Sequence, residues 1–147
     1  SANESAILIK RLLSKGTFKY DKMHGPWNEY HDNGQLWSKG IYKDGDRDGS
    51  WVWFHDNGQL LSKGIYKDDK EDGPSVSYYE NGKLFDKGTY KDGKFDGPWV
   101  FYHEDGKLMS KGNYKDGKRD GLWVTYNEDR TVWKGQTGTY KDGVKVK

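Results

Sequence analysis

Hydrophobic and polar residues recur along this chain with a step of 24 positions. Within each unit, nearly fixed residues alternate with variable ones, and alternation with a period of two is typical of β-strands. One set of fixed positions, followed by its counterparts in the next unit, is Leu36, Ser38, Gly40, Tyr42 and Leu60, Ser62, Gly64, Tyr66. A fixed step of about 20–50 residues indicates stacked structural units. The pattern therefore predicts a repeat array built from strands.

Two turn signals divide each unit. In residues 40–63 the first is Asp44-Gly45, with Asp48-Gly49 close behind, and the second is Asn57-Gly58. Asp-Gly and Asn-Gly favour turns because these residues tolerate positive φ. The segments between the signals, 50–55 and 59–67, are rich in β-branched and aromatic residues. Each unit is therefore predicted to be an antiparallel hairpin, although loops of three and four residues at Asp-Gly would pair the strand faces in opposite ways.

These elements predict an all-β fold: an elongated, twisted single antiparallel sheet of stacked hairpins, solenoid-like, with about eleven strands. The whole chain, 1–147, is expected to form one array. Its first unit is degenerate and its last carries a two-residue insertion, as expected for the ends of a repeat array. The expected units are 1–24, 25–48, 49–72, 73–96, 97–120 and 121–147.

Comparing the units with one another separates packing columns from variable columns. We infer that the fixed face packs, that its glycines leave room for a neighbouring ring, and that the variable face is exposed. Tryptophan columns either hold the thin sheet together or stack on sugars or peptides. The candidate binding surface comprises Trp37, Trp51, Trp53, Trp99, Phe101 and Trp123. Repeat three departs from the pattern, because Ser75 replaces the tryptophan and Asp69 the turn glycine.

Composition supports an ordered chain with an aromatic core. Seven Trp, 11 Tyr and 5 Phe stand among 147 residues, and the net charge is only +2. The absence of cysteine excludes disulfides and thiolate metal sites. Positive and negative residues are interleaved, so no nucleic-acid partner is expected. No run approaches the roughly 20 apolar residues of a transmembrane segment, although contact with a membrane surface stays open.

Two apparent metal motifs are better explained by repetition. Residues 44–49 match the first half of a calcium loop, but the twelfth position is His55 instead of glutamate. His31, His55 and His103 share a column, and members of neighbouring units would lie about 10 Å apart, too far to share one zinc ion. No nucleophile, base and carboxylate stand out together. We therefore expect no metal, no cofactor and no catalytic residue.

One unit reads Gly-x-Tyr-Lys-Asp-Gly-Lys-x-Asp-Gly-x-Trp, followed by Tyr and Asn-Gly-x-Leu. This pattern resembles the MORN repeat, and more closely its bacterial variant, over residues 12–143. The resemblance implies β-hairpins stacked into an elongated twisted sheet and a non-enzymatic interaction module. The bacterial variant is often assigned to antitoxin-like proteins, and MORN arrays elsewhere serve as scaffolds or membrane-associated modules.

The leading hypothesis is thus a non-enzymatic protein-interaction scaffold, antitoxin-like by resemblance, whose partner is another protein such as a toxin. Free sheet edges could also support self-association. The alternative is a cell-envelope module that binds glycan or lipid headgroups through the Trp and Lys columns. The chain is not expected to be an enzyme.

Overall fold

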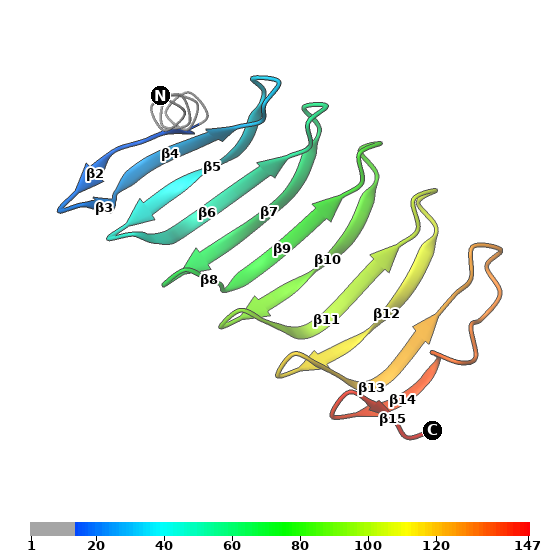
Figure 1. Ribbon diagram of the computed structural model, residues 1–147. Helices are drawn as coiled ribbons and strands as arrows, with labels where there is room; N and C mark the ends of the chain where they lie inside the picture. The colour runs from blue at the N-terminus through cyan, green and yellow to red at the C-terminus, as the bar shows by residue number, and fades with distance from the viewer. Residues whose placement is uncertain (1–13) are drawn as a thin grey trace, which may run out of the picture.

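The computed structural model describes residues 14–147 (Figure 1). Over this range the chain forms one 13-stranded antiparallel sheet and a separate two-stranded sheet, β2–β3. Consecutive strands are neighbours throughout the large sheet, with β8 paired to β7 beside its main path. The strands are β1 (Ser14–Lys15), β2 (Phe18–Lys19), β3 (Lys22–Met23), β4 (Gly25–Tyr30), β5 (Leu36–Lys43), β6 (Asp46–Phe54), β7 (Leu60–Lys67), β8 (Lys70–Glu71), β9 (Gly73–Tyr78), β10 (Leu84–Lys91), β11 (Lys94–Tyr102), β12 (Leu108–Lys115), β13 (Lys118–Thr125), β14 (Gly138–Lys141) and β15 (Val144–Lys145).

The predicted all-β array of stacked hairpins is confirmed. The large sheet has more strands than the roughly eleven expected, because several two-residue strands count separately. The expected degenerate unit, 1–24, lies partly outside the described residues.

The Asp-Gly turns are tighter than expected. Lys43 pairs with Asp46, so the loop contains two residues instead of three or four. Asp44 and Gly45 have φ of 51° and 89°, and two positive φ values are typical of a type I′ turn. Asp48-Gly49 is not a turn: Gly49, with φ of 73°, lies inside β6, where the pairing with β5 shifts register between Lys39 and Ile41. The column of Gly49 therefore marks a β-bulge.

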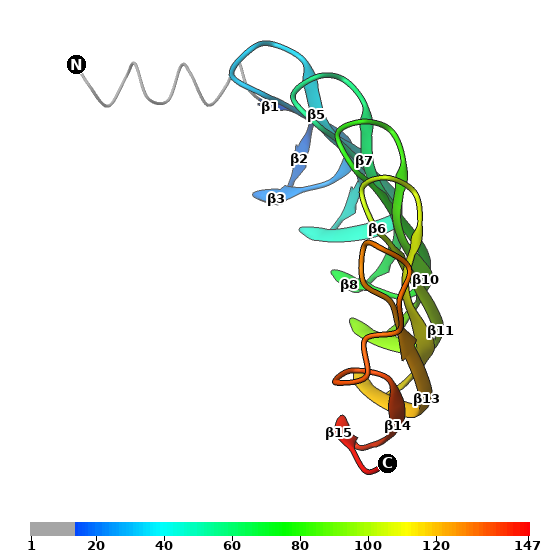
Figure 2. The same cartoon turned by 90° about the vertical axis from the view of Figure 1, so that its right-hand side faces the viewer.

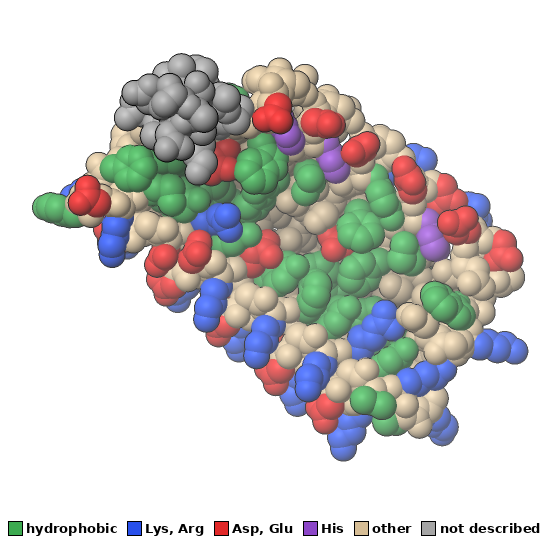
Figure 3. Space-filling view, viewed as in Figure 1, with side chains coloured by type: hydrophobic (Ala, Val, Ile, Leu, Met, Phe, Trp, Pro, Cys, Tyr) green, Lys and Arg blue, Asp and Glu red, His purple; other side chains and the backbone are tan. Residues whose placement is uncertain are grey.

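Seen edge-on, the sheet is a single curved layer, and the strand ends near β3, β6 and β8 bend toward one side (Figure 2). This side is called the concave face below. Figure 3 looks onto it and shows hydrophobic side chains gathered in a band along the middle of the sheet. In β5, Ser38, Gly40 and Tyr42 are buried on this face, whereas Lys39 and Ile41 are exposed on the opposite one.

Hydrogen bonds join each hairpin to the next at both ends of the strands. At the Asn-Gly end, His31 Nε2 donates to the carbonyl of Phe54 at 2.9 Å, and Asn33 Nδ2 donates to the carbonyl of Asp56 at 2.8 Å. At the Asp-Gly end, the Gly45 amide donates to the Met23 carbonyl at 2.9 Å. The further donors to the following hairpin at the Asn-Gly end are His55, Asn57, Tyr79, Asn81 and His103. These two rows define the stacking step.

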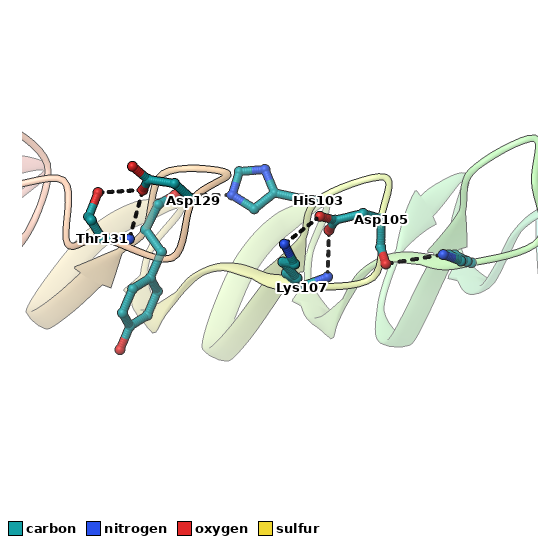
Figure 4. Close-up of polar contacts among 7 residues, drawn as sticks. His103, Asp105, Lys107, Asp129 and Thr131 are labelled. Carbon is teal, nitrogen blue, oxygen red and sulfur yellow. Dashed lines mark hydrogen bonds and ion pairs between the residues drawn. The ribbon is translucent and has the colours of Figure 1, made fainter.

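Side chains also close the Asn-Gly turns internally, and Figure 4 shows the last two of them. The Lys107 amide donates to Asp105 at 2.8 Å, and this bond is the main cause of a lowered pKa of Asp105. In the following turn, bonds from the Thr131 hydroxyl and amide lower the pKa of Asp129. Aspartate thus performs the turn-closing role that Asn33 performs in the first hairpin.

Candidate functional site: the aromatic band of the concave face

The hydrophobic band on the concave face, called the aromatic band below, contains a buried row of tryptophans: Trp27, Trp51, Trp99 and Trp123. The Trp51 ring covers Gly40, where a Cβ atom would lie 2.2 Å from the ring, and its Nε1 donates to the Ile41 carbonyl at 3.1 Å. Trp99 covers Gly88 and Trp123 covers Gly112 in the same way. The glycine column therefore exists because a ring occupies the space of its side chain, as the sequence predicted.

Tyrosines fill the spaces between these tryptophans. Tyr42 meets Trp27 at 5.7 Å and Trp51 at 4.9 Å between ring centroids, and both contacts are edge-to-face. Tyr114 meets Trp123 at 4.9 Å with the same geometry. Such pairs stabilise by about 0.5–1.5 kcal/mol beyond their buried area. The core of this thin sheet is thus built from aromatic rings on one face.

A second row of rings lies on the same face, which corrects one expectation. Trp53 lies 5.8 Å from Trp51, and Phe101 lies 5.9 Å from Trp99. Their column was expected on an exposed face opposite the packing residues, and that prediction was wrong. Two side chains separated by one residue share a face, so these rings follow the tryptophan row.

The six residues predicted as a binding surface therefore differ in accessibility. Trp51, Trp99 and Trp123 are at most 1% exposed, so they are packing residues. Trp53 and Phe101 are half-buried and border solvent. Trp37 is 42% exposed and sits at the register shift where β4 and β5 pair. The accessible part of the predicted surface is thus Trp37, Trp53 and Phe101.

The side chains of one further column cover the tryptophan rings, and the sequence analysis did not identify it. The Arg47 guanidinium lies 5.4 Å from the Trp51 ring and 5.5 Å from that of Tyr66, and the Arg119 guanidinium lies 4.3 Å from the Trp123 ring. Phe95, from the same column, lies 4.6 Å from Trp99. A cation or a ring thus covers each of these three tryptophans. The 24-residue spacing of positions 47, 71, 95 and 119 could have revealed this column, but the residue types at these positions are dissimilar.

The band is interrupted by four polar residues, called the polar break here: Glu71, Ser75, Ser77 and Asp86. Glu71 stands in the column of the capping residues, Ser75 in the tryptophan column and Asp86 in a serine column. Ser77 stands in the column that contains Trp53 and Phe101. The buried aromatic core accordingly falls into two clusters, one around Trp51 and one around Trp99 and Trp123. Acidic side chains are visible within the hydrophobic band in Figure 3.

The polar break contains two carboxylates, and one of them, Glu71, reaches into space that a ring fills in other units. Glu71 Oε1 lies 2.6 Å from where a Cβ of Gly64 would be, the space that tryptophan occupies in the neighbouring units. Asp86 is 8% exposed, and its Oδ1 has no hydrogen-bond partner. Burial raises the pKa of both carboxyls; Asp86 raises that of Glu71 further, while Arg47 lowers it. Burial and the Glu71 charge also raise the pKa of Tyr66 to about 12.

The repeats can now be compared with known families. The model of the MORN repeat variant matches residues 23–44, 47–68, 71–92 and 95–116, more than half of the chain. The chain belongs to the MORN repeat variant family. Among solved structures, a crystal structure of the GtfA/B complex bound to UDP and GlcNAc is similar over 81% of this chain and 22% of that chain, with 15% identity and a TM-score of 0.32. Comparison with curated proteins gives no match.

The shared geometry of the MORN units accounts for the histidine column. His31, His55 and His103 each contact a backbone carbonyl, so their Nε2 atoms carry protons and act as donors. In residues 14–147, no three or more His, Cys, Asp or Glu side chains are grouped in a way that could hold a metal ion. Within the same range, no helix is long and apolar enough to cross a membrane.

Proposed function

We propose that this MORN array is a non-enzymatic scaffold that binds another protein through its concave face. The observation that carries the proposal is the aromatic band: over residues 14–147 the sheet is a single layer, and no second layer covers these rings. MORN repeats generally mediate interactions with proteins or membrane lipids. A half-exposed aromatic surface is the kind of surface that binds partners, because rings contribute large contact areas at low entropic cost.

The arrangement of charge agrees with a protein interface. Figure 3 shows lysine and acidic side chains along the edge formed by the Asp-Gly turns, with acidic and histidine side chains along the opposite edge. An apolar centre with a polar rim is the usual anatomy of a protein–protein interface. Trp53 and Phe101, the half-buried rings of the second row, are the expected anchors.

The recurring polar side chains support a role other than catalysis. His55, Asn57 and Tyr79 all donate to backbone carbonyls of the next hairpin, so stacking explains their presence. The finer proposal is that the partner is a toxin that the array neutralises. It is supported by the resemblance of the repeat unit to the bacterial antitoxin-like variant.

Affinity capture with matched variants tests the scaffold. The double variant Trp53→Ser/Phe101→Ser removes both anchors and copies the native Ser77 of the same column. Ile41→Thr is the control, since Ile41 is 49% exposed on the opposite face and its column contains Thr89. We expect wild type and Ile41→Thr to retain the same protein, and the double variant to lose it.

Equal recovery by all three proteins, or no specific protein at physiological salt, would overturn the scaffold proposal. Vesicles of anionic lipid and cell-wall glycans, titrated against tryptophan fluorescence, test the alternative of an envelope module. Co-expression tests whether the partner is a toxin. The captured protein should arrest growth when it is expressed alone, and growth should continue when the array is expressed with it.

A further inference from the structure

We propose that the polar break is a subsite for one basic side chain, an arginine or lysine of the bound protein, whose cationic end lies against the carboxylates of Asp86 and Glu71. The proposal rests on the scaffold function and names the chemistry that one part of the concave face recognises. It is carried by a buried acid with an unpartnered oxygen, by the rings around it and by the small residues beside it.

The acid with an unpartnered oxygen is Asp86. It is 8% exposed and lies opposite Ser77 in the sheet, and Ser77 is its one side-chain hydrogen-bond partner among the described residues. Its Oδ1 is buried without any partner. A buried carboxylate with one unpaired oxygen and no counter-charge is costly, and a cation placed against it offsets that cost. The site is therefore incomplete without a donor from outside the array.

The charges around the two carboxylates leave Asp86 without a counter-charge. Arg47 is the cation that acts on Glu71, and it is held over the rings of Trp51 and Tyr66. The pKa of Asp86 is shifted by burial and by Ser77, with no basic group among its causes. Besides Arg47, three tyrosines interact electrostatically with these carboxylates, and burial raises the pKa of each: Tyr66, Tyr79 and Tyr90.

Aromatic rings border the break on both sides. Trp53 and Tyr66 lie on the N-terminal side, 5.6 Å apart, and Tyr90 and Phe101 on the other, both packed on Trp99. Ring faces attract organic cations, and carboxylates bind guanidinium and ammonium groups through charge-assisted hydrogen bonds. Ser75 places a hydroxyl where the other units have tryptophan, and Ser77 places one where the two adjacent units have Trp53 and Phe101. An organic cation suits this environment better than a metal ion, which would need further oxygen ligands.

Small probes test the subsite without requiring the protein partner. The full chain, labelled with ¹⁵N, is titrated with N-acetylarginine amide, N-acetyllysine amide and the neutral isostere N-acetylcitrulline amide. Saturable amide shifts are expected at Glu71, Ser75–Ser77 and Asp86 with the arginine or lysine probe, and none with citrulline. Asp86→Asn should weaken binding about tenfold or more, and Glu71→Gln should act in the same direction.

Two controls carry the same loss of charge outside the break: Asp92→Asn in an exposed turn and Glu80→Gln beside the Asn-Gly turn. Both should bind the probe like wild type. Equal shifts with citrulline, equal weakening in the controls, or shifts located elsewhere would each overturn the subsite. If the probe binds at the break but capture recovers no protein, the scaffold function fails and the cation site stands. If capture recovers a protein but the probe does not bind, the scaffold function stands and the cation site fails.

Discussion

The third MORN repeat, residues 71–92, and the fourth, 95–116, have the same strand pairing but different side chains on the concave face. In both, the bulge before the Asn-Gly turn falls at the same place, after Ser77 in one and after Phe101 in the other. The fourth buries Trp99 under Phe95, whereas the third puts Ser75 and Glu71 at those positions. Backbone pairing and turn-to-turn bonds are thus sufficient to keep the sheet continuous, and the concave face is free to vary.

Repeat arrays tolerate such a difference because each unit is stabilised by its neighbours. The turn before the third repeat shows the same tolerance: Asp69 replaces glycine but keeps a φ of 63° and still donates to the Arg47 carbonyl, at 3.3 Å. The contrast between the two repeats predicts where substitutions are costly and where they are not.

The largest effect is expected from copying the third repeat into the fourth. Trp99→Ser removes a fully buried ring and the hydrogen bond from its Nε1 to the Thr89 carbonyl, so it should lower the free energy of unfolding by about 3–5 kcal/mol. Ser75→Ala, the matched change in the polar break, should cost less than about 1 kcal/mol. Urea unfolding followed by circular dichroism measures both. Similar costs at the two sites would show that the ring contributes little.

Alanine substitution of the glycine beside each site should show the same contrast in stability: it should be costly beside Trp99 and nearly neutral beside Glu71. A Cβ on Gly88 would lie 2.1 Å from the Trp99 ring, which cannot move without disturbing the core. A Cβ on Gly64 would meet the Glu71 carboxylate at 2.6 Å, the end of a flexible side chain. Gly88→Ala should therefore cost about 3 kcal/mol and Gly64→Ala less than about 1 kcal/mol. Thermal unfolding of both variants measures the difference; a reversed order would contradict the geometry.

Filling the polar break should join the two aromatic clusters. Ser75→Trp/Glu71→Phe gives the third repeat the pair that the fourth has in Trp99 and Phe95. We expect a gain of about 2 kcal/mol from the ring contacts and buried area. Ser75→Trp alone should gain much less, because Glu71 still occupies the space over Gly64. Equal stability of the single and double variants would show that Glu71 does not obstruct the ring.

The sequence predicted the turns at Asp44-Gly45 and Asn57-Gly58, the glycine–tryptophan pairing and the anomaly at Ser75, because these depend on local residue preferences and on one column at a time. It did not predict that Trp53 shares a face with Trp51. The two residues are separated by one position and so share a face, but the ring that recurs at Phe54 and its counterparts was taken to mark the packing face instead. Glu71 and Asp86 also escaped notice, since they belong to different columns and only the stacking of hairpins brings them together.

The polar break should also make stability depend on pH. Burial raises the folded-state pKa of Asp86 and Glu71 above the unfolded values, so their contribution favours the folded state below those values and is lost as pH rises through the folded pKa. Lowering the pH from 7 toward about 4.5 should thus stabilise wild type relative to Asp86→Asn/Glu71→Gln, by on the order of 1 kcal/mol. Urea unfolding at both pH values gives the difference. A difference that does not change with pH would contradict the prediction. The titration of Asp105 and Asp129 does not affect the comparison, because both proteins contain these residues.

The smallest effect is expected where the third repeat differs in residue type but not in role. Tyr79 stands in the histidine column, and its hydroxyl donates to the Tyr102 carbonyl at 2.6 Å, as His55 Nε2 donates to the Tyr78 carbonyl at 2.9 Å. Tyr79→His should therefore change the free energy of unfolding by less than about 0.5 kcal/mol, whereas Tyr79→Phe should cost about 1 kcal/mol. Thermal unfolding of the two variants separates these values. If histidine were as costly as phenylalanine, the ring contact of Tyr79 with Phe85, at 5.1 Å, would contribute as much as the hydrogen bond between hairpins.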